Sequence, residues 1–152
     1  DILVANRNPA ATCRYLIEHH GVVEDHKSSG VWVAAPAGST AAIAAAGGEI
    51  LPLDVDRIQW RVRESFSADA KRPVWMQGRF GSDDELLLVS KMSEGALFLD
   101  GPHRRIAFPV GSRLRLLVSD SPLFLVVSDK MQQRRRQLLA NQIPFEDSSL
   151  AL

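Results

Sequence analysis

The chain has 152 residues, 45% of them hydrophobic, and carries 18 basic and 18 acidic side chains, so its formal net charge at pH 7 is zero. This length can bury the core of one domain, and the neutral charge argues against nucleic acid or a membrane surface as a partner. Cys13 is the only cysteine, which excludes an intrachain disulfide, and no apolar run reaches the length of a membrane span. These features together predict a soluble, cytoplasmic protein.

Most of the chain is predicted to form short β-strands. Apolar and polar side chains alternate in residues 58–63 and 113–118, as in half-buried strands. Apolar runs between turn signals predict the others, so that the expected strands in chain order are 2–5, 13–17, 31–35, 58–63, 75–80, 86–89, 96–99, 106–110, 113–118 and 123–127. Short strands with tight turns favour a mainly β (α+β) protein built as an antiparallel β-sandwich.

Three histidines, His19, His20 and His26, fall between the predicted strands. Histidine often binds metals, but no carboxylate pattern or cysteine pair joins these three at a recognised ligand spacing. They are therefore interpreted as exposed loop residues, and no metal site is expected. The acidic run 83–85 offers an alternative place for a cation, but a solvated hairpin tip is the favoured interpretation.

Residues 29–48 read SGVWVAAPAGSTAAIAAAGG, an apolar strand followed by a turn and a short helix expected over residues 40–46. Gly38 lets the chain turn, and Ser39 or Thr40 is expected to cap the helix. Backbone amides in a first helical turn lack partners within the helix and favour a phosphate or another anion nearby. On these features alone, a nucleotide site and a plain strand-turn-helix in the core are equally good interpretations. The turn lacks the lysine of a P-loop and the flanking glycines of a nucleophile elbow.

A second helix is predicted over residues 129–141, with Ser128 as its N-cap. Its modest apolar stripe and the arginine run 134–136 favour a helix docked on the surface with the arginines at least partly in solvent. The alternative is that these arginines meet a partner subunit or a nucleotide phosphate. We expect two units, a sandwich domain over residues 1–127 and a helix with a tail over residues 128–152.

Residues 29–48 resemble the signature of the NAD kinase family, in which a strand precedes a Thr/Ala-Pro-x-Gly-Ser-Thr-Ala turn and an Ala/Ser-rich helix ends in Gly-Gly. Residues 1–4 resemble the second half of the family's Asn-Asp motif and the strand after it. Further segments follow in the order of the family's carboxy-terminal domain, at residues 51–53, 58–63 and 98–101. The resemblance covers residues 1–127 and implies that an upstream part of the protein is missing.

NAD kinases transfer the terminal phosphoryl group of ATP, or in some members polyphosphate, to the 2′-hydroxyl of the adenosine ribose of NAD or NADH. The resemblance implies that this chain is the dinucleotide-binding carboxy-terminal domain, with Mg²⁺ used by the intact enzyme and a homo-oligomer as its assembly. The family's catalytic Gly-Gly-Asp-Gly motif belongs to the amino-terminal domain and is not in this sequence. Glu49 follows Gly47-Gly48 but sits at the end of the signature helix, so no catalytic residue is assigned. The chain is expected to be inactive alone.

The same resemblance implies which residues bind the dinucleotide. Asp1 takes the acidic place of the Asn-Asp motif, where its carboxylate accepts hydrogen bonds from ribose or amide donors. Thr40 and Ala41 match the Thr-Ala pair that contacts the adenine portion, and Ala37 matches the variable residue that lines the same pocket.

Two further positions of the dinucleotide site depart from the family pattern. Ala42 replaces the usual tyrosine and Ser29 replaces the usual aspartate, which removes a stacking ring and a hydrogen-bond acceptor. The sequence around both positions is most similar to the plant-type NADH kinase branch, which predicts a preference for NADH over NAD. Two alternatives stay open: a diacylglycerol- or sphingosine-type lipid kinase with a large apolar pocket between its sheets, and a non-catalytic nucleotide-binding module.

Overall fold

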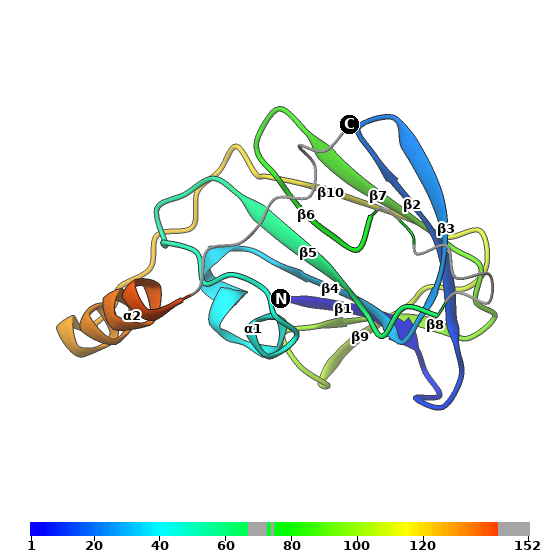
Figure 1. Ribbon diagram of the computed structural model, residues 1–152, viewed down its shortest axis with the longest axis horizontal. Helices are drawn as coiled ribbons and strands as arrows, with labels where there is room; N and C mark the ends of the chain where they lie inside the picture. The colour runs from blue at the N-terminus through cyan, green and yellow to red at the C-terminus, as the bar shows by residue number, and fades with distance from the viewer. Residues whose placement is uncertain (67–72, 74, 143–152) are drawn as a thin grey trace.

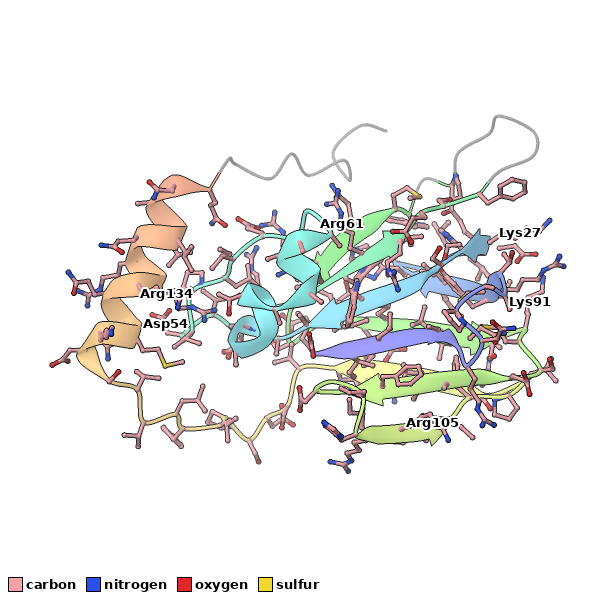
Figure 2. All side chains as sticks on the ribbon, turned by 90° about the horizontal axis from the view of Figure 1, so that it is seen from below. Lys27, Asp54, Arg61, Lys91, Arg105 and Arg134 are labelled. Atoms are coloured by element: carbon pink, nitrogen blue, oxygen red, sulfur yellow. The ribbon has the colours of Figure 1, made fainter. Side chains whose placement is uncertain are left out.

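The protein is described by a computed structural model over residues 1–66, 73 and 75–142. Two antiparallel sheets pack against each other (Figure 1), one with strand order β6-β5-β4-β1-β8-β9 and the other with order β10-β7-β2-β3. The predicted antiparallel β-sandwich is confirmed. Charged side chains such as Lys27, Lys91 and Arg105 lie on its outside (Figure 2).

The strands are β1 (Ile2–Asn6), β2 (Cys13–His19), β3 (Val22–Ser28), β4 (Gly30–Ala34), β5 (Ile58–Arg63), β6 (Gln77–Phe80), β7 (Glu85–Ser90), β8 (Gly95–Leu99), β9 (Arg104–Ala107) and β10 (Arg113–Leu117). A 3₁₀-helix η1 (Pro36–Thr40), a short helix α1 (Ala42–Ala45) and a terminal helix α2 (Asp129–Asn141) complete the described elements. The second predicted helix is confirmed with its cap, because the Ser128 hydroxyl accepts a hydrogen bond from the backbone N–H of Met131 at 3.3 Å.

The core lies between the two sheets. Strands β2 and β7 bury every second side chain, and these pack against Val4, Val31 and Trp60 of the other sheet. Each large aliphatic side chain buried in this way contributes about 1.5–3 kcal/mol. In β2 and β7 the pleat, which turns successive side chains to opposite faces, therefore decides which residues enter the core.

Strand β3 was not predicted from the sequence. Its residues, VVEDHKS, do not alternate cleanly, because β3 is the edge of its sheet and pairs with β2 alone, from Cys13↔Ser28 to His19↔Val22. Two histidines in this hairpin are buried, with His19 3% and His26 0% exposed. The interpretation of both as exposed loop residues is wrong, whereas His20 lies exposed at the turn.

The strand expected at residues 123–127 is absent from the structure. Those residues have no strand partner and run exposed between β10 and α2, with Phe124 88% exposed. An apolar run has strand propensity, but it forms a strand only where a sheet edge is available to pair with it. Earlier in the chain, β9 covers residues 104–107 instead of the expected 106–110. It ends before Pro109, which lacks the N–H that strand pairing needs. No helix among the described residues is long and apolar enough to cross a membrane.

Candidate functional site

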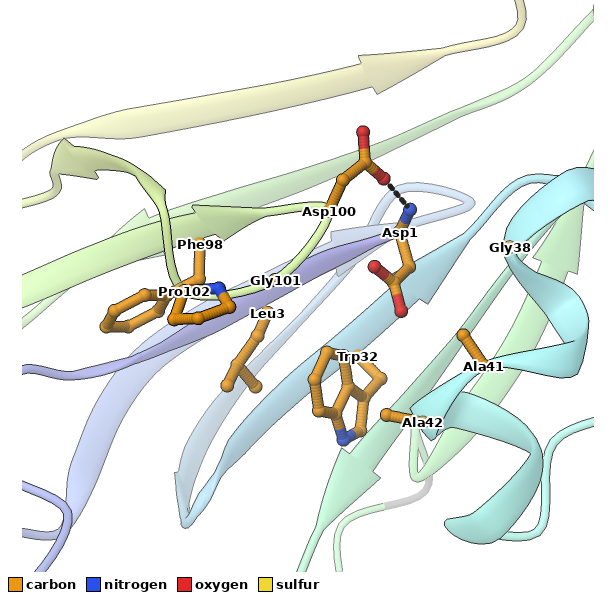
Figure 3. Close-up of a pocket in the computed structure, with 10 residues that line it drawn as sticks. All are labelled: Asp1, Leu3, Trp32, Gly38, Ala41, Ala42, Phe98, Asp100, Gly101 and Pro102. Carbon is orange, nitrogen blue, oxygen red and sulfur yellow. Dashed lines mark hydrogen bonds and ion pairs between the residues drawn. The ribbon is translucent and has the colours of Figure 1, made fainter.

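A pocket of about 600 Å³ opens where η1 and α1 meet the end of the larger sheet (Figure 3). Its walls are mainly apolar and come from β1, β4, β8, the η1–α1 segment and the β8–β9 turn. The apolar lining consists of Leu3, Trp32, Ala41, Ala42, Phe98 and Pro102. Such a cavity, large and apolar with a few polar groups at its rim, is typical of sites for small molecules and cofactors.

Two carboxylates supply the charge at this pocket. The backbone nitrogen of Asp1 donates a hydrogen bond to Asp100 Oδ1 at 2.7 Å. The carboxylate of Asp1 points toward Trp32 and Ala41 (Figure 3). A carboxylate in that position accepts hydrogen bonds from the hydroxyl groups of a ligand.

The small residues of η1 let the turn approach the sheet closely. A Cβ atom at Gly38 would lie 3.1 Å from the backbone nitrogen of Asp1 and 3.2 Å from its Cβ. A side chain at position 38 would therefore require Asp1 or η1 to shift. Gly38 does not have a positive φ, so this close contact favours glycine here and the turn does not require it.

Ser39 stabilises the turn from inside the protein and does not cap a helix. Its buried hydroxyl donates to the carbonyl oxygen of Pro36 at 2.7 Å and accepts from the backbone N–H of Leu51 at 2.9 Å. The expected capping by Ser39 or Thr40 is wrong, because η1 and α1 begin after Ala35 and Ala41 without a side-chain cap. The expected helix 40–46 is also shorter, since residues 36–40 form the 3₁₀-turn.

Arg135 of α2 reaches the same turn from the carboxy-terminal helix. Its guanidinium donates to the Leu51 carbonyl at 3.0 Å, to Ser39 Oγ at 2.9 Å and to the Pro36 carbonyl. Burial lowers the pKa of Arg135. Arg134 and Arg136 are exposed and Arg135 is partly exposed, as expected for arginines at least partly in solvent. Nothing in an Arg-Arg-Arg run indicates which of the three guanidinium groups bonds the turn.

The structure brings some of the six expected site residues together. Asp1, Ala41 and Ala42 line the pocket, whereas Thr40 faces a second pocket between η1 and α2. Ala37 is exposed on η1 and does not line the first pocket.

Ser29, the last of the six, lies away from the pocket between β3 and β4. Its backbone N–H donates to the carbonyl of Arg63 at 3.0 Å. Sequence reasoning did not assign Phe98 and Pro102 to the site, because only the pairing of β8 with β1 places them there. Trp32 could have been found from its place on the strand that leads into the signature turn, four residues before Pro36.

Comparisons with known proteins bear on this site. No family model matches the chain. A curated relative, the probable NADH kinase of Oryza sativa subsp. japonica, is 34% identical over 134 residues, which cover 84% of this chain and 41% of the relative. The chain thus spans about two fifths of the length of that relative.

Two solved structures share the fold. The NAD kinase from Archaeoglobus fulgidus in complex with ATP has a TM-score of 0.71 at 18% identity, over 91% of this chain and 52% of its own. The yeast NADH kinase complexed with NADH has a TM-score of 0.62 at 21% identity, over 76% of this chain and 33% of its own.

Proposed function

The chain belongs to the NAD kinase family, and we propose that it is the dinucleotide-binding part of an NADH kinase. On this proposal the intact enzyme transfers a phosphoryl group from ATP or polyphosphate to the 2′-hydroxyl of the adenosine ribose, forming NADPH or NADP. The observation that carries the proposal is the apolar pocket beside the Pro-Ala-Gly-Ser-Thr turn, with a carboxylate at its rim. Its relatives support the proposal, since one is named a probable NADH kinase and the solved neighbours hold ATP and NADH.

The pocket has the chemistry to hold a flat heterocycle. Its volume of about 600 Å³ lies within the range of roughly 300–1,000 Å³ that small-molecule sites occupy. Trp32 and Phe98 supply aromatic surface, and Ala41 and Ala42 leave room above it. Stacking of one base on an aromatic side chain contributes about 1–3 kcal/mol in nucleic-acid sites.

The carboxylate of Asp1 would favour substrate over product. A carboxylate accepts hydrogen bonds from the free hydroxyls of a ribose, but it repels a phosphate on the 2′-oxygen. Placed beside the ribose, Asp1 would bind NADH or NAD and lower the affinity of the site for NADPH or NADP. This arrangement would help the enzyme to release its product.

Catalysis would require residues from elsewhere in the protein. The sequence contains no Gly-Gly-Asp motif, and among the described residues the one group of three possible metal ligands is His19, His20 and Asp84. Two imidazoles suit transition metals better than Mg²⁺, so this group does not fit the Mg²⁺ of a phosphoryl transfer. We therefore propose that this chain binds dinucleotide but does not turn it over alone.

Two alanines of the same helix test the site. Ala42 lines the pocket and Ala45 is exposed outside it. Ala42→Leu adds bulk inside the pocket, so its NADH dissociation constant should rise about 5- to 150-fold, equivalent to the 1–3 kcal/mol typical of overpacking. Ala45→Leu should bind like the parent chain. The measurement is a fluorescence titration with NADH, and equal affinities of the two variants, or no NADH binding by the parent, would exclude this pocket.

The two alternatives are tested differently. A lipid kinase was expected to have a large apolar pocket between its sheets, but in the described residues that space is filled by core side chains such as Tyr15, Trp60 and Leu88. A non-catalytic module is distinguished by assaying the intact protein with NADH and ATP for NADPH. The same assay with NAD tests the preference for NADH. The cytoplasmic location, the homo-oligomer and the use of polyphosphate stay predictions.

A further inference from the structure

Two turns at one end of the sandwich bring metal-binding side chains together. His19 closes β2, His20 begins the turn to β3, and Asp84 immediately precedes β7 (Figure 1 shows both turns). One ligand atom from each of these three residues lies within 4.8 Å of the others. Asp84 Oδ2 is 3.2 Å from His20 Nε2 and 3.7 Å from His19 Nδ1.

We propose that His19, His20 and Asp84 bind a divalent first-row transition-metal ion such as Zn²⁺. Zinc bound tetrahedrally at about 2.0–2.1 Å places neighbouring ligand atoms roughly 3.3–3.5 Å apart. The separations of 3.2 and 3.7 Å in the structure fall on either side of that range. Two imidazoles with one carboxylate select zinc, copper, cobalt or nickel over Mg²⁺ and Ca²⁺.

The backbone of the next residue orients the carboxylate of Asp84 for this role. Asp84 Oδ1 accepts a hydrogen bond from the N–H of Glu85 at 2.7 Å. This bond holds the carboxylate so that Oδ2 faces the two histidines. Ligating carboxylates in metal sites are commonly held by a second hydrogen bond of this kind.

His19 is held equally firmly by packing. It is 3% exposed, and the ring of Trp75 meets it edge to face at 5.3 Å between centroids. Its Nδ1 lies 3.1 Å from the carbonyl oxygen of Glu85. Coordination through Nδ1 places the ring proton on Nε2 and replaces that hydrogen bond, which leaves the carbonyl free to accept one from a metal-bound water.

His20 has a left-handed backbone conformation, which glycine, asparagine and aspartate adopt more readily than histidine. Its φ is +49°, and Gly21 follows with φ +74°, as in the two-residue hairpin turns that usually carry Asn-Gly or Asp-Gly. This conformation places the His20 ring beside that of His19, with 4.0 Å between centroids. The side chain of His20 is 57% exposed, so an ion can enter from solvent. The cluster shares no residue with the apolar pocket and does not rest on the proposed function.

The experiment is a titration of the untagged chain with Zn²⁺ by calorimetry and with Co²⁺ by absorption and tryptophan fluorescence. His20→Asn keeps a residue that tolerates positive φ, and Asp84→Asn keeps the hydrogen bond to Glu85. His103→Asn is the matched control, an exposed histidine in the β8–β9 turn. Circular dichroism without metal checks that all three variants fold like the parent.

The parent and His103→Asn should bind one Zn²⁺ per chain, and Co²⁺ should quench the fluorescence of Trp75. His20→Asn and Asp84→Asn should each weaken binding by about tenfold or more, since even groups that only orient a metal ligand change affinity about 10- to 100-fold when mutated. No binding by the parent, or an affinity of either His20→Asn or Asp84→Asn equal to that of the parent, would overturn the proposal. In that case the cluster is an ordinary ion pair between two turns.

Discussion

Replacing Arg135 with alanine should release α2 from the signature turn. The arginine donates to the Pro36 and Leu51 carbonyls and to the Ser39 hydroxyl, and α2 has no fully buried residue of its own. A second contact joins the helix end to the chain, where the side chain of Gln142 exchanges hydrogen bonds of 2.8 and 3.1 Å with the backbone of Ile50. The docking of α2 therefore depends on few interactions, and Arg135 makes most of them.

The free energy with which Arg135 holds α2 to the turn follows from the charge on its guanidinium. A hydrogen bond to a charged group contributes about 1.5–3 kcal/mol net, and a group left unpaired in the protein costs a similar amount. Once α2 leaves, water bonds the three acceptors in place of the guanidinium. We therefore expect the loss of one such hydrogen-bond energy rather than three. Opening of α2 should then become more frequent by about 10- to 150-fold, since 1.4 kcal/mol corresponds to a factor of ten.

Hydrogen exchange measures this opening directly. Arg135→Ala should lower the protection of amides in α2 and in residues 37–41, whereas Arg134→Ala, which removes the exposed neighbour, should leave both unchanged. Arg135→Lys should recover only part of the protection, because lysine lacks the planar fork that reaches several acceptors at once. Equal protection in the Arg134 and Arg135 variants would refute the reasoning.

Two further predictions concern stability. Gly30 has φ +118°, and a Cβ there would lie 2.3 Å from the Val4 carbonyl oxygen, so Gly30→Ala should lower the free energy of urea unfolding by about 3 kcal/mol or more. Gly111 has φ +82° and lies in open space, so Gly111→Ala should lower it by only about 1–2 kcal/mol. Equal losses in the two variants would contradict this. Burial lowers the pKa of His26 below its usual 6.5, so below that pH the unfolded chain binds a proton that the folded chain does not. The free energy of unfolding therefore decreases as the pH falls, by up to about 1.4 kcal/mol per pH unit. His26→Phe keeps a ring stacked on Tyr15 and should flatten this dependence below about pH 6.5; an unchanged slope would show that His26 does not cause it.

Local patterns in the sequence predicted most of the sandwich. Strand β5 follows its sequence alternation from Trp60 to Arg63, because Trp60 and Val62 are buried in the core while Arg61 and Arg63 are only partly buried. Gln59 breaks the pattern, since it is buried on the opposite face, where its side chain bonds the backbone of Glu49. Strand β3 escaped detection because an edge strand tolerates charges that hide the period. Residues 123–127 have the composition of a strand without a partner. Pairing is a property of the sheet, and a single segment does not reveal it.

The Pro-Ala-Gly-Ser-Thr turn and the family it indicates were determined by the sequence alone, since a contiguous motif keeps its residues together whatever the rest of the chain does. Only the tertiary structure placed Phe98 in the pocket wall, turned Arg135 toward Ser39 and brought Asp84 to the histidines of another hairpin. These contacts join residues up to 96 positions apart in the chain. They form when the two sheets pack and α2 folds back, and no local pattern in the sequence encodes which side chains then meet.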